Sequence, residues 1–491
     1  MSADKFNIFR LADKKIVMLH MSWVAFFITF FMWFSHSSLL PLIQKTFGLS
    51  PAETKALLFL NVALTIPSRT LVGALVDKFG PRLMFSVLLV ISGGLCIGFA
   101  LAQSYEQLAA FRFLLGFAGA GFVIGIRLIT EWFPAKQAGT AQGIYGGWGN
   151  FGAAAAGFLL PALAGWFGGD EGWRGAAGSA GIVAILYAFI FYKVARNTPK
   201  GSTYFKPKKL GPMEVTSKFD LVLYIIMCAP MFVAMGVIAW RLSPAGVSLL
   251  SDSVTWAIWG ALVIWFIYQV VQIYRVNAET LKTEVPELHR YKFKQVALLN
   301  LSYMVTFGSE VAVVSMLPLF FINTFGVSIA AAGAMASSFM VMNLVARPGG
   351  GYISDKVGRK VALLITVIGS GLGYWGMSHF DSSWSIPATM AVVIFCSFFV
   401  QAGAGATFGV VPTIKRRLTG QIAGLTGAYG NIGAASYLLV YSLTDATTFF
   451  TVIGLTCAVV AVLLMIFMEE PKGQIAELMP DGSVQLIDVG R

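Results

Sequence analysis

The chain has 491 residues, of which 57% are hydrophobic and only 12% are charged. A mean hydropathy of +0.75 is typical of a protein with many membrane spans and excludes an ordinary soluble domain. The net charge of +12 does not indicate nucleic-acid binding, because the basic residues lie mostly in short segments between apolar runs, where they set topology.

Apolar runs of about 20 residues, the length that crosses a bilayer, divide the chain into predicted helices. The first six lie at residues 17–43, 55–76, 83–102, 107–133, 140–167 and 174–195. A basic segment (196–218), two further runs (220–242 and 254–274) and a charged segment (275–294) come next. The last six lie at 295–322, 330–353, 360–378, 387–411, 421–443 and 447–468. The sequence therefore predicts an all-α integral membrane protein with about 14 spans.

The two sets of six helices are internal repeats. LPLIQKTFGLS from Leu40 corresponds to LPLFFINTFGVS from Leu317, and GGWGNFG at Gly146 corresponds to GAYGNIG at Gly427. Such repeats, with a site between them near the membrane midplane, are typical of secondary transporters that work by alternating access. We predict an N-terminal repeat (1–195), an insert of loops and two extra helices (196–294), a C-terminal repeat (295–468) and a cytoplasmic tail (469–491).

Each repeat has an arginine inside its second helix, Arg69 in one and Arg347 in the other. A charge at the bilayer centre costs about 2.5 to 3.5 kcal/mol, so an arginine there indicates function. Two guanidinium groups ~8 Å apart repel by about 2 kcal/mol, whereas an anion ~4 Å from each gains about 4 kcal/mol per contact. The planar guanidinium suits oxyanions, and nitrate, nitrite, formate and other small carboxylates all qualify. The alternative is that a buried carboxylate neutralises each arginine.

Three residues of the helix at 295–322, Tyr303, Phe307 and Glu310, fall on one stripe. The two aromatic residues either pack in the core or form a slot whose width rejects larger or tetrahedral anions. Glu310 is predicted to lie near the centre of the membrane. An acidic residue at that depth is rare and indicates a proton relay or a partner for an arginine. Nearer the cytoplasmic end of the helix at 107–133, Arg127 and Glu131 are expected to form an ion pair.

Small residues recur at helical spacing around Asn150 and Asn431, in the helices at 140–167 and 421–443. Such faces allow two helices to approach closely, and packing alone can account for them. The other interpretation is that backbone and asparagine amides at these crossings also donate hydrogen bonds to the anion. Both can hold together, because a narrow path for a small flat ion needs close helices.

The turns that follow the two arginines share the pattern GxxxD(K/R)xGR(K/R). One copy has Gly351, Asp355, Lys356, Gly358, Arg359 and Lys360, and the other has Gly73, Asp77, Lys78, Gly80 and Arg82, with Pro81 where a basic residue is usual. This pattern resembles the signature loop of the major facilitator superfamily. The resemblance implies the major facilitator fold and a gating role for these residues, through ion pairs that open and close during transport.

Within that superfamily, the glycine-rich segments around Asn150 and Asn431 resemble those of the nitrate/nitrite porter family. The resemblance implies that Arg69 and Arg347 hold the anion and that Tyr303 and Phe307 pack against it. Glu310 departs from the exchanger-like members, where an apolar residue is expected, and favours proton-coupled nitrate uptake. Exchange of nitrate for nitrite, and transport of a small organic anion such as formate or oxalate, remain the alternatives.

Other classes of protein are disfavoured. The sequence has no haem, metal or nucleotide motif, so we expect that the protein is not an enzyme and that it has no cofactor and no metal site. Its polar segments are too short for a receptor's sensing domain. The bias of lysine and arginine places both termini in the cytoplasm and the spans in the cytoplasmic membrane. We expect a monomer whose partners are a small inorganic anion, protons and membrane lipid.

Overall fold

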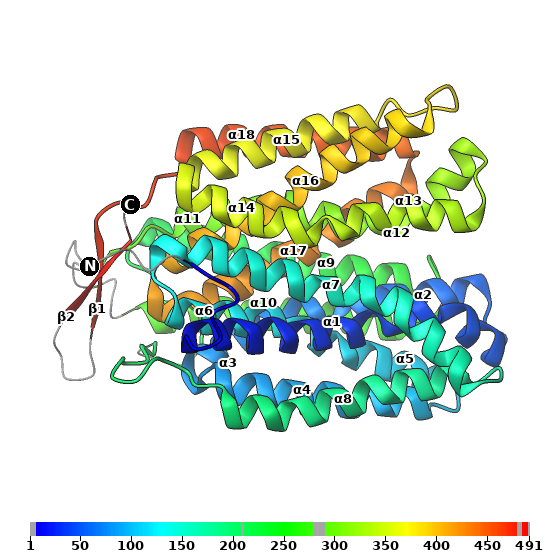
Figure 1. Cartoon of the computed structure of the whole chain (residues 1–491), viewed down its shortest axis with the longest axis horizontal. Coiled ribbons are helices and arrows are strands. Elements are labelled where there is room, and N and C mark those ends of the chain that lie inside the picture. The colour runs from blue at the N-terminus through cyan, green and yellow to red at the C-terminus, as the bar shows by residue number, and fades with distance from the viewer. Residues whose placement is uncertain (1–5, 208–210, 279–281, 283–289, 479–483, 490–491) are drawn as a thin grey trace.

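The computed structural model describes residues 6–207, 211–278, 282, 290–478 and 484–489 (Figure 1). In these residues, 11 helices are long and apolar enough to cross a membrane. The helices lie roughly parallel, and the first and last described residues lie at the same end of the bundle (Figure 1). The all-α architecture predicted from the sequence is confirmed.

The N-terminal repeat folds into helices that begin and end within a few residues of the predicted limits. They are α1 (Lys14–Phe47), α2 (Pro51–Ala63), α3 (Thr65–Phe79), α4 (Pro81–Leu101), α5 (Tyr105–Leu114), the 3-10 turn η1 (Leu115–Ala120), α6 (Gly121–Trp132), α7 (Ala135–Phe167) and α8 (Gly172–Val194). Local chemistry explains the limits. Gly48 ends α1 with a φ of 64°, and Ser50 caps α2 in a reciprocal capping box with Glu53.

The insert contributes a helical hairpin, α9 (Lys218–Leu242) and α10 (Asp252–Asn277). The C-terminal repeat follows with α11 (Phe293–Tyr303), the π-helical turn η3 (Met304–Gly308), α12 (Ser309–Phe325), α13 (Ile329–Val341), α14 (Asn343–Val357), α15 (Arg359–Met377), α16 (Ile386–Val410), the 3-10 turns η4 (Val411–Thr413) and η5 (Arg416–Leu418), α17 (Thr419–Leu443) and α18 (Ala446–Phe467).

The two spans that carry the arginines are each divided in two, at Leu64 between α2 and α3 and at Met342 between α13 and α14. No single half is as long as a membrane span, and α17 carries glycines and an asparagine among its apolar residues. These three spans are the difference between the 11 helices above and the predicted count, so 14 spans stays a prediction. The proposed limits of the four segments, at 195, 294 and 468, also stay predictions.

The last described part of the chain is a β-hairpin of β1 (Gln474–Leu478) and β2 (Val484–Asp488), paired antiparallel with Gln474 opposite Asp488. The sequence predicted only a tail here. The preceding Glu470 accepts the backbone N–H groups of Arg359 and Lys360, both at 2.8 Å, at the start of α15. A carboxylate is favoured at a helix N-terminus, so this contact holds the tail against the end of the bundle.

Candidate functional site

Arg69 and Arg347 lie over one aromatic ring. The guanidinium carbon of Arg69 is 5.2 Å from the centroid of Phe307, and that of Arg347 is 5.5 Å from the same centroid. Both arginine side chains are buried. Arg69 comes from α3 in the N-terminal repeat and Arg347 comes from α14 in the C-terminal repeat. Each repeat therefore contributes one cation to a single buried site.

Arg69 is held by backbone oxygens. Its Nε donates to the carbonyl of Gly119 at 3.0 Å and its Nη1 to the carbonyl of Gly427 at 2.8 Å. Its Nη2 is buried and has no hydrogen-bond partner among the described residues, and no described carboxylate pairs with the side chain. Carbonyl dipoles orient this guanidinium but leave its charge uncompensated, so one donor remains for a ligand.

Arg347 differs because a carboxylate reaches it. Its Nη2 lies 2.8 Å from Oε2 of Glu310, whose other oxygen accepts from Nδ2 of Asn343 at 2.8 Å. The side chains of Arg347 and Glu310 are 1% and 3% exposed, so this is a buried ion pair. Nε of Arg347 has no partner among the described residues. The alternative that a buried carboxylate neutralises each arginine is therefore correct for Arg347. It is wrong for Arg69 among the described residues.

An aromatic stack forms one wall of the site. The rings of Tyr303 and Phe307 are nearly parallel, with centroids 5.0 Å apart and an angle of 4°, and the ring of Phe122 is also nearly parallel to that of Tyr303, at 6.0 Å and 5°. Phe408 meets Tyr303 edge-on at 4.7 Å. The π-helical turn that follows Tyr303 belongs to this wall. A Cβ at Gly430 would lie 2.6 and 2.7 Å from the rings of Phe307 and Tyr303, so only glycine lets α17 pack against them.

Sequence reasoning missed Phe122 and Phe408. Each lies in a helix, α6 and α16, whose apolar residues look alike, and no spacing in the sequence distinguishes these two phenylalanines. The one available signal was the GAG tripeptide at Gly119 and Gly403, which precedes each of them in its repeat by three to five residues.

The two predicted asparagines turn inward to their own helices. Nδ2 of Asn150 donates to the carbonyl of Gly146 at 2.6 Å, and Nδ2 of Asn431 donates to that of Gly427 at 3.2 Å. The Gly427 carbonyl thus accepts from both Asn431 and Arg69. In this structure the asparagines shape the helix backbone behind the arginines, and a role as direct anion donors stays a prediction.

Asp77 joins the two repeats at the expected cytoplasmic end. Its carboxylate accepts the backbone N–H groups of Gly420 and Gln421 at 2.9 and 2.8 Å, in the first turn of α17. Nε of Arg127 lies 3.1 Å from the same carboxylate, and Nη1 of Arg127 lies 2.9 Å from Glu131. The predicted ion pair between Arg127 and Glu131 is confirmed, and it belongs to a buried network with Asp77.

Asp355 does the equivalent at the other arginine helix. It accepts the backbone N–H groups of Gly139 and Thr140, at 3.0 and 2.6 Å, near the start of α7. Arg359 lies 2.6 Å from Asp355 and donates to the carbonyl of Ala135 at 2.6 Å. The contacts of Asp355 with Gly139 and Thr140 and of Arg359 with Ala135 cross between the repeats, so the expected cytoplasmic end of the bundle is closed in this structure.

The remaining residues that the sequence predicts to form a gate differ in what they contact. A Cβ at Gly73 would lie 2.3 Å from the Gly420 carbonyl, and one at Gly351 would lie 1.9 Å from the Gly139 carbonyl, so both glycines sit at crossings between repeats. The basic residues lie over rings of their own repeat instead: Lys78 over Phe79, Arg82 over Tyr192 and Lys356 over Tyr352.

Tyr204 in the loop after α8 was not anticipated. Its ring lies 4.6 Å from the guanidinium carbon of Arg127, and its hydroxyl donates to the carbonyl of Val76 at 2.6 Å. Burial raises the pKa of Tyr204 above its ordinary value, so the phenol keeps its proton and remains a donor at neutral pH. The basic segment after α8 therefore covers one side of the buried network of Asp77, Arg127 and Glu131.

Comparison with known proteins places these features in context. The model of the Major Facilitator Superfamily matches residues 22–281 and 299–484. A nitrate/nitrite transporter NrtP of Nostoc punctiforme is 45% identical over 478 residues, covering 96% of this chain and 95% of that protein. Its namesake in a Picosynechococcus species is 43% identical, with 94% of each chain covered. High-affinity nitrate transporter 2.3 of Oryza sativa is 26% identical over 88% of this chain and 73% of its own.

Solved structures agree on the fold. The proton:xylose symporter XylE superposes with a TM-score of 0.62 at 16% identity, covering 94% of this chain and 97% of that one. The human organic anion transporter MFSD10 gives a TM-score of 0.61 at 13% identity, with 92% and 99% covered. At such identities the likeness concerns the fold alone.

Proposed function

Because this chain belongs to the major facilitator superfamily and, within it, to the nitrate/nitrite porters, we propose that it carries nitrate and nitrite through the membrane by alternating access with the anion between Arg69 and Arg347. The observation that carries this is the uncompensated Arg69 beside Arg347 over one ring. A buried unsatisfied donor costs about 1 to 3 kcal/mol, and more when charged. An oxyanion that accepts from Nη2 of Arg69 and Nε of Arg347 removes that cost at both residues.

The shape of the wall favours a flat ion. Tyr303 and Phe307 present nearly parallel ring faces beside the two guanidinium groups. A planar nitrate or a bent nitrite fits with its oxygens toward the arginines and its plane along the rings. A tetrahedral anion such as phosphate has oxygens on every side and would press one of them into the apolar ring face, where it finds no donor.

Glu310 supplies a route for coupling to protons. With Glu310 ionised, its carboxylate occupies Nη2 of Arg347 and competes with the anion. A proton on Glu310 removes the negative charge and frees Arg347, so the protonated carrier binds nitrate better. By linkage, bound nitrate in turn favours the protonated form. We therefore favour proton-coupled nitrate uptake over exchange.

The same ion pair bears on the exchange alternative. If both arginines were bare, their repulsion would oppose closure of the empty site, and each crossing would need an anion. Glu310 neutralises Arg347 in the empty site, which lowers that repulsion and lets the unloaded carrier return. Transport of formate or oxalate is the remaining alternative, since a carboxylate also offers two oxygens to an arginine.

Nitrate uptake into proteoliposomes tests both the substrate and the coupling. Uptake into vesicles without internal anion when the outside is acidified supports proton symport. Uptake that requires nitrite inside, and is indifferent to pH, supports exchange and makes Glu310 a structural partner of Arg347. Labelled formate or oxalate that enters and is not displaced by excess nitrate and nitrite would overturn the choice of substrate.

The multi-pass chain is proposed to lie in the cytoplasmic membrane with both termini inside and to work as a monomer. Two observations support the orientation. The described ends of the chain lie together at one end of the bundle (Figure 1), and the basic residues of the connecting loops gather at the same end. Each monomer has its own pair of arginines, so the site needs no second copy. A terminal fusion to a reporter that matures only in the cytoplasm tests the orientation.

A further inference from the structure

Two cavities lie between the inserted hairpin, α9 and α10, and the transport helices. One has a volume of about 350 Å³ and is bounded by α3, α9, α10, α17 and residues 211–213. The other, of about 380 Å³, is bounded by α2, α3, α5, α9 and α10. Pro67, Leu71 and Trp265 line both of them, so the two cavities meet and form one groove along α3.

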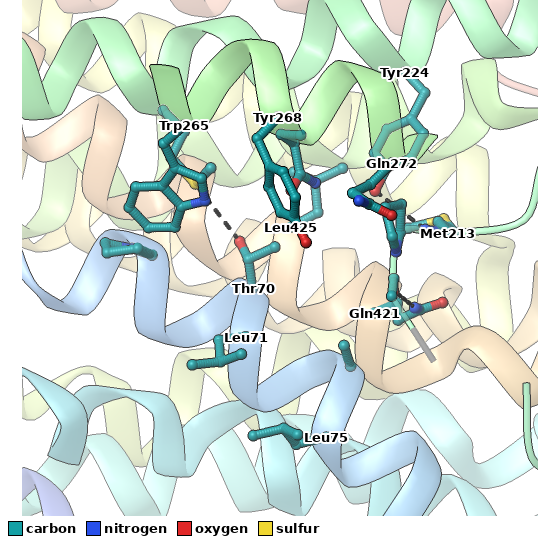
Figure 2. Close-up of a pocket in the computed structure, with 16 residues that line it drawn as sticks. Thr70, Leu71, Leu75, Met213, Tyr224, Trp265, Tyr268, Gln272, Gln421 and Leu425 are labelled. Carbon is teal, nitrogen blue, oxygen red and sulfur yellow. Dashed lines mark hydrogen bonds between the residues drawn. The ribbon is translucent and has the colours of Figure 1, made fainter. Parts of the chain in front are cut away.

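The two ends of the groove differ in polarity. The described lining of the first cavity includes Thr70, Tyr268, Gln269, Gln272 and Gln421, which carry hydroxyl and amide groups and no charge (Figure 2). The described lining of the second cavity is apolar apart from Ser68 and includes leucines and phenylalanines of α2, α5 and α9. An elongated molecule with one polar end and one apolar end matches this arrangement.

Gln421 gives the polar end an unmet hydrogen bond. Its side chain is 6% exposed, its Nε2 donates to the carbonyl of Gly211 at 2.7 Å, and its Oε1 is buried without a partner among the described residues. A buried polar atom usually finds a partner. A hydroxyl group bound in this cavity would be a donor of the kind that Gln421 lacks.

The groove is open toward the bilayer. Leu71, Trp265 and Tyr268 form part of its rim, and their side chains are 52%, 42% and 59% exposed on the membrane-embedded surface. A molecule therefore reaches the groove sideways from the lipid phase. Since neither cavity opens onto Arg69 or Arg347, its occupant is distinct from the transported anion.

We propose that this groove binds one membrane lipid with an uncharged, hydroxyl-bearing headgroup, held by Gln269, Gln272 and Gln421, with its chain in the apolar cavity. The site bears on the gate, because α3 and α17 belong to different repeats and both form its walls. The backbone N–H of Gln421 also donates to Asp77. Opening the gate separates α3 from α17 and dismantles the polar end, so the bound lipid stabilises the closed gate.

Lipid retention by the full-length protein tests the proposal. The protein is placed in phosphatidylcholine nanodiscs that contain either digalactosyl diacylglycerol or phosphatidylglycerol, and native mass spectrometry counts the lipids that remain bound after release. We expect one galactolipid per protein and no retention of phosphatidylglycerol above the phosphatidylcholine background. Equal retention of the two probes would overturn the choice of an uncharged headgroup.

Three variants localise the binding. Ala74→Trp fills the polar cavity and should abolish retention, and Gln272→Leu removes one amide and should weaken it about five-fold, the effect of one hydrogen bond. Ile91→Trp places the same side chain on the lipid-facing side of α4, at a position 50% exposed, and should retain lipid as the natural protein does. Gln272 lies on the partly exposed face of α10, so this variant keeps the test informative if Ala74→Trp fails to fold. Unchanged retention in Gln272→Leu would overturn the site.

Discussion

Two arginines at equivalent positions of the repeats have different chemical states. Arg69 donates only to backbone carbonyls and has no counter-charge among the described residues, whereas Arg347 forms an ion pair with Glu310. The sequence predicted both arginines and the acid but could not assign the acid to one of them, because a separation of 37 positions along the chain between Glu310 and Arg347 gives no distance in space. In the proposed mechanism, this asymmetry makes Arg69 the permanent anchor of the anion, whereas Arg347 binds the anion fully only when Glu310 is protonated.

Replacement of Arg69 by lysine should weaken anion binding strongly. Lysine keeps the charge but cannot donate to the Gly119 and Gly427 carbonyls and to the anion in the same fixed geometry. Loss of a charged hydrogen bond costs about 1.5 to 3 kcal/mol, so we expect the KM for nitrate to rise by about 10- to 100-fold. Uptake kinetics in proteoliposomes measure it. Arg196→Lys, in the exposed loop after α8, is the matched control, and an unchanged KM in Arg69→Lys would contradict the proposed site.

Glu310→Gln should separate transport from pH. Glutamine keeps an oxygen for Asn343 but cannot bind or release a proton, and it leaves Arg347 permanently free for the anion. Net nitrate uptake should no longer increase when the outside is acidified, while exchange of labelled nitrate for internal nitrite should persist. Glu469→Gln, at a carboxylate of the tail, should leave the pH dependence intact. Uptake by Glu310→Gln that still follows the proton gradient would rule out the coupling role.

At the scale of helices, the predicted limits were accurate because apolar runs and caps are local properties. The breaks at Leu64 and Met342 and the π-helical turn at Met304–Gly308 were not predicted, since they depend on which neighbouring helix satisfies or crowds the backbone. The gating glycines were predicted from a motif, but their partners, Gly420 and Gly139, lie in the other repeat and became visible only in the folded molecule.

Gly424→Ala should hinder closure of the gate. A Cβ at this position of α17 would lie 2.5 Å from the Arg69 carbonyl and 3.3 Å from Cα of Gly73, so α3 and α17 could not meet as they do here. Overpacking costs about 1 to 3 kcal/mol, and we expect uptake to fall by about 10-fold. Gly94→Ala in α4, where a Cβ meets nothing within 4 Å, should be neutral. Equal activity of the two variants would show that the crossing of α3 and α17 accommodates an extra methyl group.

The whole molecule is closed at the end where the termini lie, through matching contacts made by Asp77 and Asp355 across the two repeats. Alternating access requires that these contacts break in each cycle. The tail adds to this end, where Nζ of Lys415 donates to the Ala476 carbonyl of the β-hairpin at 2.6 Å. Strands of only five residues carry little sequence signal, which explains why the hairpin was not predicted.

A disulfide across the gate should stop the carrier. Oγ1 of Thr140 and Oδ2 of Asp355 are 2.6 Å apart, so the side chains at these two positions face each other in the closed state. The double variant Thr140→Cys/Asp355→Cys should lose nitrate uptake on oxidation and regain it on reduction, while each single variant should be indifferent to oxidant. The four natural cysteines are buried and interfere little. Oxidised, cross-linked protein that still transports nitrate would mean that the gate opens elsewhere.

The glycine crossings also constrain how the gene can vary. Any single-base change in a glycine codon that alters the amino acid introduces a Cβ, whichever base is hit. At Gly73, Gly350 and Gly351 that Cβ would fall 2.3, 2.0 and 1.9 Å from a carbonyl oxygen of a neighbouring helix. Every single-base change that replaces one of these glycines by another amino acid therefore creates a steric clash. In a saturation library selected for growth on nitrate, only glycine should be recovered at these three positions. Many residues should be recovered at positions such as Gly94.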